Sequence, residues 1–189
     1  MNITFESYIA TSLDGYIARL NGKLDWLDGA TEKDSKEDYG YFDFMASIDC
    51  IVMGRSSFEK VASFPEWPYQ GKRVIVLSKT MKDAPEPLTH KVDFFNGKVE
   101  LLAVELQNLG LKKVYVDGGL TVQSFIDAKL LDAITITQIP VLIGRGIPLF
   151  AEKSLSADIK MQLVKSQSYA SGFVQSKYNI EYPKGRFFE

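Results

Sequence analysis

The sequence has few of the residues that covalent cross-links, metal sites and nucleophilic catalysis require. Cys50 is the only cysteine and His90 the only histidine among 189 residues. One cysteine cannot form a disulfide within the chain, and the two residues cannot supply the ligands of a zinc site. His90 lies in the proline-rich segment 84–90, which is typical of a surface loop, so we expect it to be solvated. The sequence therefore predicts no disulfide, no metal and no histidine-based catalysis.

The sequence also lacks an excess of positive charge and any long apolar run. There are 22 lysines and arginines against 24 aspartates and glutamates, a formal net charge of -2, and the basic residues are scattered. We therefore expect no nucleic-acid partner. No apolar run approaches the roughly 20 residues of a membrane-spanning helix, and residues 1–6 lack the features of a secretory signal. We expect no membrane partner and a cytoplasmic location.

The apolar residues that are present indicate one α/β domain. Hydrophobic residues make up 46% of the chain, enough for one buried core and short for two, so a single domain over residues 1–189 is predicted. Short β-branched runs alternate with segments of helical spacing. The final strands, 159–168 and 172–182, are expected to form an antiparallel hairpin. The other predicted elements are strands at 3–10, 49–54, 72–77, 92–95, 112–116 and 132–141 and helices at 31–47, 99–109 and 120–130.

The most informative stretch is a strand, a tight turn and a helix start within residues 112–126. Its apolar run, 114–116, is typical of a strand that is covered on both faces. Gly118 and Gly119 follow, and glycine permits positive φ and the close approach of a ligand. The free N–H groups of the next helix would point at that ligand, for which phosphate is the natural candidate. A tight turn between a strand and a helix also needs glycine for steric reasons alone.

Polar and basic side chains follow two further predicted strands. Ser56 and Glu59 have the spacing of a capping box, which alone accounts for the serine. Arg55 lies at the positive end of a helix dipole, where a cation is unfavourable without an anion, so it favours a bound phosphate. Ser78 and Lys79 follow the strand at 72–77. Three strand ends with such residues fit a dinucleotide that carries a 2'-phosphate, although the GxGxxG fingerprint is absent.

Five motifs span nearly the whole chain. They are SLDGYIA at 12–18, MGRSSFE at 53–59, VLSKT at 76–80, VDGG at 116–119 and PVLIGRGIPLF at 140–150. In this order the chain resembles the dihydrofolate reductase-like superfamily, and within it the reductase domain at the C-terminus of the riboflavin-biosynthesis deaminase/reductase. The last motif, with Gly144, Gly146 and Pro148, is more similar to riboflavin-type reductases than to true dihydrofolate reductases. The zinc ligands of the deaminase are absent, so a stand-alone reductase domain is expected.

This resemblance implies a three-layer α/β fold with a mixed, mostly parallel sheet, NADPH as hydride donor and often a homodimer. The apolar residues of the final strands also make a homodimer plausible. The loop of Asp14, Gly15 and Tyr16 would border nicotinamide and substrate. The residues implied in binding cofactor phosphates are Gly54, Arg55, Ser56, Ser57, Ser78 and Lys79, with Gly118, Gly119, Leu120, Thr121 and Val122 at the pyrophosphate.

The resemblance also implies an acidic residue on the first helix, which binds the pterin and assists protonation in dihydrofolate reductases. Counting back from Met53 without gaps places Asp38 there, one turn before Phe42, so that both would share one helix face and contact the substrate. Glu37 and Asp34 are rivals, because a gap of one residue changes the assignment. Carboxylates in a first helical turn are also stabilised by the helix dipole without any catalytic role.

The sequence therefore predicts an NADPH-dependent reductase that transfers hydride to a C=N bond of a small heterocycle, a pterin or an amino-pyrimidine of riboflavin biosynthesis. The alternative is a non-catalytic NADP(H)-binding module, a sensor or interaction protein that keeps the cofactor cleft. The cofactor motifs indicate what binds, whereas turnover depends on the acid. A panel of substrates separates the two hypotheses.

Overall fold

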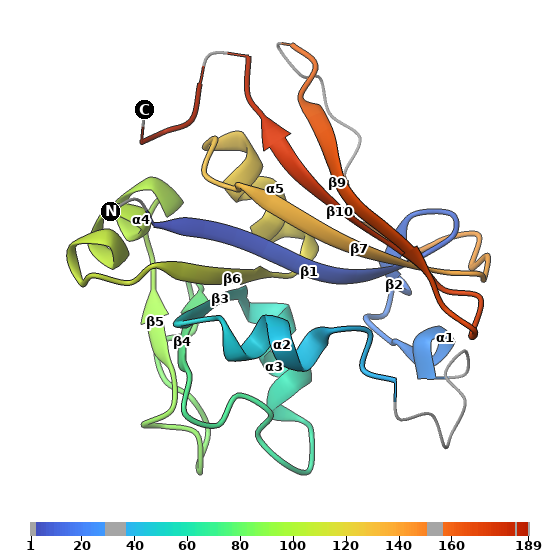
Figure 1. Ribbon diagram of the computed structural model, residues 1–189. Coiled ribbons are helices and arrows are strands. Elements are labelled where there is room, and N and C mark those ends of the chain that lie inside the picture. The colour runs from blue at the N-terminus through green and yellow to red at the C-terminus, as the bar shows by residue number, and fades with distance from the viewer. Residues whose placement is uncertain (1–2, 29–36, 151–156, 184, 189) are drawn as a thin grey trace.

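The fold is built on one eight-stranded sheet with the strand order β5-β4-β3-β6-β1-β7-β10-β9 (Figure 1). The computed structural model describes residues 3–28, 37–150, 157–183 and 185–188. Every pairing from β5 to β7 is parallel, whereas β10 runs antiparallel to both β7 and β9. The strand bounds are β1 Thr4–Ser12, β3 Cys50–Gly54, β4 Arg73–Leu77, β5 Asp93–Phe95, β6 Lys113–Asp117, β7 Ala133–Ile139, β9 Lys160–Ser168 and β10 Val174–Glu181. The predicted mixed sheet and C-terminal hairpin are confirmed.

Helices cover both faces of the sheet, as Figure 1 shows. The main helices are α2 (Tyr41–Ala46), α3 (Arg55–Ala62), α4 (Val99–Asn108) and α5 (Gly119–Asp127), and α1 (Asp25–Asp28) is a single turn. Side chains of β3 alternate between the two layers: Cys50 and Val52 pack with α4 and α5, whereas Ile51 and Met53 pack with α2 and α3. All four are fully buried, which explains why β3 reads as a continuous apolar run.

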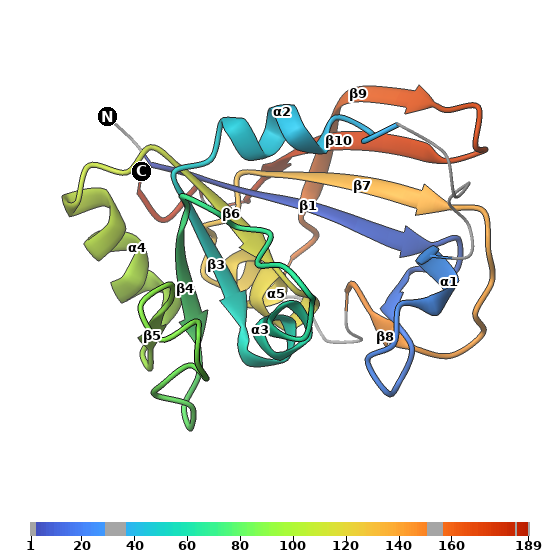
Figure 2. The same cartoon turned by 90° about the horizontal axis from the view of Figure 1, so that it is seen from below.

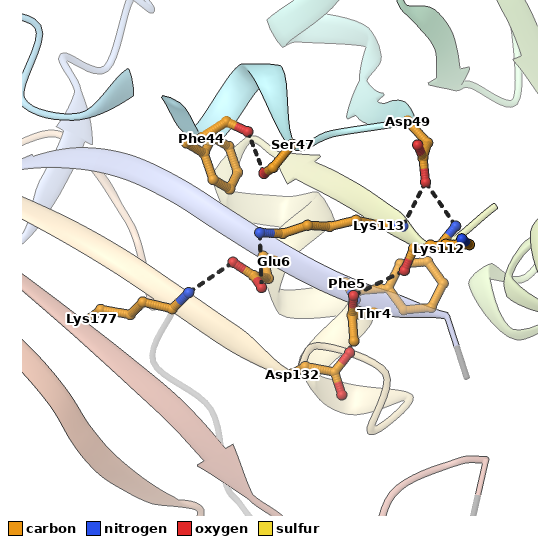
Figure 3. A network of polar contacts seen from close by, with 10 residues as sticks. All are labelled: Thr4, Phe5, Glu6, Phe44, Ser47, Asp49, Lys112, Lys113, Asp132 and Lys177. Carbon is orange, nitrogen blue, oxygen red and sulfur yellow. Dashed lines mark hydrogen bonds and ion pairs between the residues drawn. The ribbon is translucent and has the colours of Figure 1, made fainter. Parts of the chain in front are cut away.

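A network of ion pairs links the central strands on the α2 side of the sheet (Figure 3). Glu6 of β1 lies 3.3 Å from Lys113 Nζ of β6 and 3.1 Å from Lys177 Nζ of β10. The Lys113 ammonium also lies 5.6 Å from the centre of the Phe44 ring in α2. Asp49 accepts hydrogen bonds from the backbone N–H groups that open β6. These contacts join strands that are distant in sequence, and we assign them a structural role.

Two helix starts differ from the predictions. The helix expected over 31–47 begins only at Tyr41, because Tyr39 and Gly40 have positive φ angles of 57° and 84° and cannot belong to a right-handed helix. Residues 31–36 lie outside the described residues. The helix α3 begins at Arg55 with Gly54 as its N-cap and without a side-chain cap, so the capping box predicted for Ser56 and Glu59 is wrong.

Within the part of the chain that the structure describes, no helix has both the length and the apolar character needed to cross a membrane.

Candidate functional site

The three segments predicted to bind phosphate meet at one edge of the sheet. Because β3 pairs in parallel with both β4 and β6, the carboxyl ends of the three strands lie together. Gly54 at the end of β3 is opposite Leu77 of β4, and Met53 is opposite Asp117 of β6. Arg55 after β3 and Gly118 after β6 therefore lie at neighbouring strand ends. The Ser78–Lys79 segment, which follows β4, lies on the other side of β3.

Two helices begin at this edge with free N–H groups. Both α3 and α5 follow a glycine N-cap, and no described side chain caps either helix. The first hydrogen bond within α5 runs from Val122 N to Gly118 O at 2.9 Å. The N–H groups of Gly119, Leu120 and Thr121 consequently have no partner inside the helix. Two helix N-termini side by side present N–H donors and positive dipole ends, which is an arrangement suited to an anion.

Arg55 connects the start of α3 to the turn after β4. Its Nη1 donates to Thr80 Oγ1 at 3.2 Å, and its Nε lies 3.6 Å from Glu59 Oε1 one helical turn away. Ser78 shapes that turn, because its Oγ accepts the N–H groups of Thr80 and Met81 at 3.2 and 2.8 Å. The contacts with Thr80 and Glu59 therefore hold the half-exposed guanidinium at the carboxyl edge of the sheet.

The packing of the protein itself leaves little room beside the glycine pair. Gly118 has a φ of 90°, and a Cβ at this position would lie 2.5 Å from Ser57 Oγ. A Cβ on Gly119 would lie 2.8 Å from Ile17 Cδ1 and 3.3 Å from the Pro148 carbonyl oxygen. Protein atoms thus occupy the space beside both glycines. Steric reasons alone can therefore explain the two glycines, as the sequence analysis left open. The argument for a bound phosphate consequently depends on the helix N-termini.

We expect Gly118→Ala to lower the free energy of unfolding by about 1–3 kcal/mol, because alanine is strained at this backbone conformation and its methyl group meets Ser57. Urea unfolding measures the change. Gly110→Ala is the matched control, since Gly110 has a φ of 77° but open space around it, and it should lose only the smaller backbone contribution. Equal losses in the two variants would show that Ser57 imposes no steric demand.

Asp14 links the motif at 12–18 to the motif at 140–150 through hydrogen bonds. Its Oδ1 accepts the Ser12 hydroxyl at 2.6 Å and the Ile143 N–H at 3.3 Å, while its Oδ2 accepts the Gly144 N–H at 2.7 Å. The Ser12 hydroxyl, together with these backbone N–H groups, lowers the pKa of the Asp14 carboxyl. An ionised Asp14 therefore holds the loop after β1 against the motif at 140–150.

Backbone pairing continues this link. Tyr16 in β2 (Tyr16–Ala18) pairs with Pro148 in β8 (Ile147–Pro148), and the Leu149 N–H donates to Gly15 O at 3.1 Å. Neither short strand was predicted. The loop expected to border nicotinamide and substrate is thus a fixed part of the fold, and it adjoins the start of α5 through Pro148 and Ile17.

Asp38 lies in the segment that leads into α2 and not on a helix face shared with Phe42, so that part of the prediction is wrong. Its two carboxylate oxygens accept the N–H groups of Gly40 at 3.0 Å and Phe42 at 2.8 Å. The hydrogen bond from Phe42, followed by that from Gly40, lowers the pKa of Asp38. Asp38 is therefore an ionised, partly exposed carboxylate beside Phe42, whose side chain is 74% exposed. The rival Asp34 lies outside the described residues.

The carbonyl oxygen of Tyr39 fixes the Asp38 segment on the sheet. It accepts hydrogen bonds from the hydroxyl of Tyr8 in β1 and from Gln175 Nε2 in β10, the latter at 3.0 Å. The Tyr39 ring stacks on Phe173 with ring centres 5.0 Å apart. These contacts hold Tyr39 in its left-handed conformation and place Asp38 near the middle of the sheet.

Asp117 is a candidate functional residue that the sequence reasoning missed. The Tyr115 hydroxyl lies 3.0 Å from both Asp117 Oδ1 and the Tyr8 carbonyl oxygen, yet it has one proton to donate. If Asp117 is ionised, the Tyr115 proton is shared between the two acceptors; if Asp117 is protonated, it can donate to Tyr115 Oη while Tyr115 donates to Tyr8. Burial also raises the pKa of the Asp117 carboxyl, although hydrogen bonds from Tyr115, Ser57 and Gly118 oppose the rise.

The pKa values of the two carboxyl groups are therefore displaced in opposite directions, that of Asp117 upward and that of Asp38 downward. Asp117 is surrounded by tyrosines that stay neutral, since burial raises the pKa of Tyr41 to about 12 and that of Tyr69 further. Asp38 is partly exposed to solvent and accepts hydrogen bonds from two backbone N–H groups. Two carboxyls whose pKa values are displaced in opposite directions are a pattern that enzymes use to assign an acid and an anionic partner.

The parallel strands, the antiparallel C-terminal hairpin and the helix starts at the carboxyl edge define a dihydrofolate reductase-like α/β domain. The model of the RibD C-terminal domain family matches residues 6–175, and the chain belongs to this family. The resemblance proposed from the motifs is confirmed.

Individual relatives agree with this assignment. The uncharacterized protein YwjB of Bacillus subtilis (strain 168) is 34% identical over 173 residues, which cover 90% of this chain and 94% of YwjB. A crystal structure from Shewanella sp. PV-4, of a protein proposed to act in riboflavin biosynthesis, has a TM-score of 0.87 and 38% identity and covers 95% of this chain and 100% of that one. The deaminase/reductase of Thermotoga maritima shares the fold, with a TM-score of 0.72 and 14% identity, over 94% of this chain and 56% of its own.

Proposed function

We propose that this protein is an NADPH-dependent reductase that transfers hydride to a C=N bond of a small heterocycle, a pterin or a ribosylamino-pyrimidine. The observation that carries the proposal is the pair of uncapped helix N-termini, α3 and α5, at the ends of adjacent parallel strands with Arg55 beside them. Membership of a riboflavin-biosynthesis reductase family supports an oxidoreductase. The substrate class follows the same family relationship.

The described residues fit a dinucleotide phosphate. The N–H groups that open α3 and α5, those of residues 55–57 and 119–121, would bind the pyrophosphate. Arg55, Ser78 and Lys79 would bind the 2'-phosphate from the neighbouring strand ends. Val122 is fully buried and its N–H donates to Gly118 O, so in this proposal it only packs α5. Bound NADPH would supply the hydride.

Protein side chains supply the rest of the chemistry in this proposal. Protonated Asp117 is the acid, placed one residue before the glycine pair and partly exposed. Asp38 is the anionic group that orients the N–H edge of the heterocycle, with the exposed ring of Phe42 next to it. Leu13 and Leu142, 55% and 72% exposed on adjoining loops, form an apolar rim that suits a flat ring.

Arg55→Ala is expected to abolish most of a preference for NADPH over NADH, because NADH lacks the 2'-phosphate. The guanidinium is half exposed, so we expect a loss of about tenfold in NADPH affinity, at the low end for a charge-assisted pair. Calorimetric titration with both cofactors measures it. Lys60→Ala, which removes a cation from the far end of α3, is the control and should change neither affinity. Equal affinity of the parent protein for NADPH and NADH contradicts the assigned role of Arg55.

We also propose a cytoplasmic homodimer formed through β9. This strand is the outer edge of the sheet (Figure 2). All nine of its residues are exposed. Leu163 and Val164 are 56% and 53% exposed on a strand whose outer edge pairs with no other strand of the described residues. We expect sedimentation to give the mass of a dimer for the parent and of a monomer for Leu163→Lys, with unchanged circular dichroism. A monomeric parent protein contradicts this interface.

A further inference from the structure

A hollow lies at the opposite end of β4 from the proposed cofactor edge. It has a volume of about 320 Å³ and opens between the loop before β4 and the loop before β5. Its lining includes Arg73 and Val74, the first residues of β4, whereas Ser78 and Lys79 follow the last. Five residues of strand span roughly 16 Å, so this cavity is separate from the helix N-termini. Its volume is at the small end for ligand sites and too small for a dinucleotide.

The floor of the cavity is aromatic and apolar. Trp67 and Tyr69 are 9% and 6% exposed, and their rings meet edge to face with centres 5.4 Å apart. Val74 and Val92 complete the floor and are also buried. Such a surface favours a planar apolar ring, which can lie against the indole without losing hydrogen bonds to water.

The rim of the cavity is cationic. Lys72, Arg73 and Lys91 line the cavity with a single carboxylate, Asp93, and the His90 imidazole adds a hydrogen-bonding group. Arg73 pairs with Asp93 at 3.0 Å, so the Asp93 charge is already compensated. Lys72 Nζ donates to the neutral Ile48 carbonyl oxygen at 2.7 Å, and its charge also acts on the Asp49 carboxylate. Lys91 has no such carboxylate partner among the residues that line the cavity apart from Asp93, which is already paired, so the mouth keeps a positive charge.

We propose that this cavity is a second ligand site, for a small anion that carries one planar ring, such as an aryl phosphate or an aryl carboxylate. The ring lies on Trp67 and the anionic group faces the rim of Lys72, His90 and Lys91. This proposal does not rest on the proposed reductase chemistry, although Tyr69 in the lining also contacts Tyr41, which lies near Asp117.

Phenyl phosphate is the probe, and Trp67 fluorescence is the readout. Trp26 and Trp67 are the only tryptophans, and the Trp26 indole N–H has no hydrogen-bond partner among the described residues, so Trp26→Phe isolates Trp67 without removing a hydrogen bond. The titration is done with saturating NADP⁺, which keeps the probe from the cofactor edge. We expect a saturable change in emission, with weaker binding of inorganic phosphate and of benzyl alcohol.

Replacement of the polar side chains at the rim tests whether phenyl phosphate binds in this cavity. The double variant His90→Ala/Lys91→Ala should bind phenyl phosphate about tenfold more weakly. Lys98→Ala, which removes an exposed cation that does not line the cavity, should bind it as the parent does. If Trp26→Phe fails to fold, saturation-transfer NMR of the probe with the unaltered tryptophans replaces the fluorescence. No saturable binding, an affinity that the rim variant leaves unchanged, or a loss in Lys98→Ala each overturns the proposal.

Discussion

Asp117→Asn is expected to lower kcat by about 10²- to 10⁴-fold, the range for a lost general acid, while NADPH affinity stays nearly the same. The amide keeps the shape of the side chain but cannot deliver a proton to the substrate. It can still donate to Tyr115 Oη, 3.0 Å from the present Oδ1, so the fold should tolerate it. Steady-state kinetics and a cofactor titration on the same variant separate chemistry from binding.

The pH dependence of the rate makes this test specific. Burial raises the pKa of Asp117, so the folded protein keeps the proton at pH values where a free aspartate has lost it. If the protonated form is active, kcat of the parent falls as pH rises through the folded-state pKa, and Asp117→Asn lacks this limb. Asp43→Asn, a change at an exposed carboxylate in α2, is the control with an unchanged profile. A variant at Asp117 with the parent's rate and profile rules out its role as the acid.

Asp38→Asn is expected to lower kcat/KM by about 10- to 100-fold and to leave NADPH affinity unchanged. The loss arises because an ionised carboxylate that orients the N–H edge of a heterocycle becomes a neutral amide. The NH₂ group of the asparagine cannot accept a hydrogen bond, so the variant loses the hydrogen bond from either the Gly40 N–H or the Phe42 N–H. The stability of the variant must therefore be measured in parallel.

Glu37→Gln provides the matched comparison for Asp38. Glu37 Oε1 accepts the Tyr39 N–H at 2.9 Å, so both carboxylates hold the same segment through a local backbone hydrogen bond. A role in shaping the segment predicts similar, small stability losses in both variants. A role in orienting substrate predicts a kinetic loss at Asp38 alone. Equal catalytic losses would therefore remove the special role of Asp38.

The parts of the fold set by local patterns could be predicted from the sequence. β3 and β6 are buried on both faces, so their apolar runs indicated parallel strands, and the residues after them marked the cofactor edge. The segment before α2 could not be predicted, because Asp38 and its acidic neighbours resemble a first helical turn. What prevents a helix there is the left-handed Tyr39, whose carbonyl oxygen is held by Tyr8 and Gln175 from distant strands.

Asp117 was missed for a similar reason. In sequence it is one polar residue between an apolar strand and two glycines, and its position alone says nothing of its protonation. Its state depends on the Tyr115 hydroxyl and the Tyr8 carbonyl oxygen, which only the pairing of β1 with β6 brings together. The link made by Asp14 likewise needs Gly144, 130 residues away.

The most direct test of the account is the absorbance of NADPH during incubation with the protein and a panel of dihydropterins and ribosylamino-pyrimidines. The account predicts that at least one of these substrates oxidises NADPH at a rate proportional to protein concentration, and that NADH supports a slower reaction. NADPH that binds but is not consumed with any member of the panel would contradict a reductase and favour the non-catalytic cofactor-binding module.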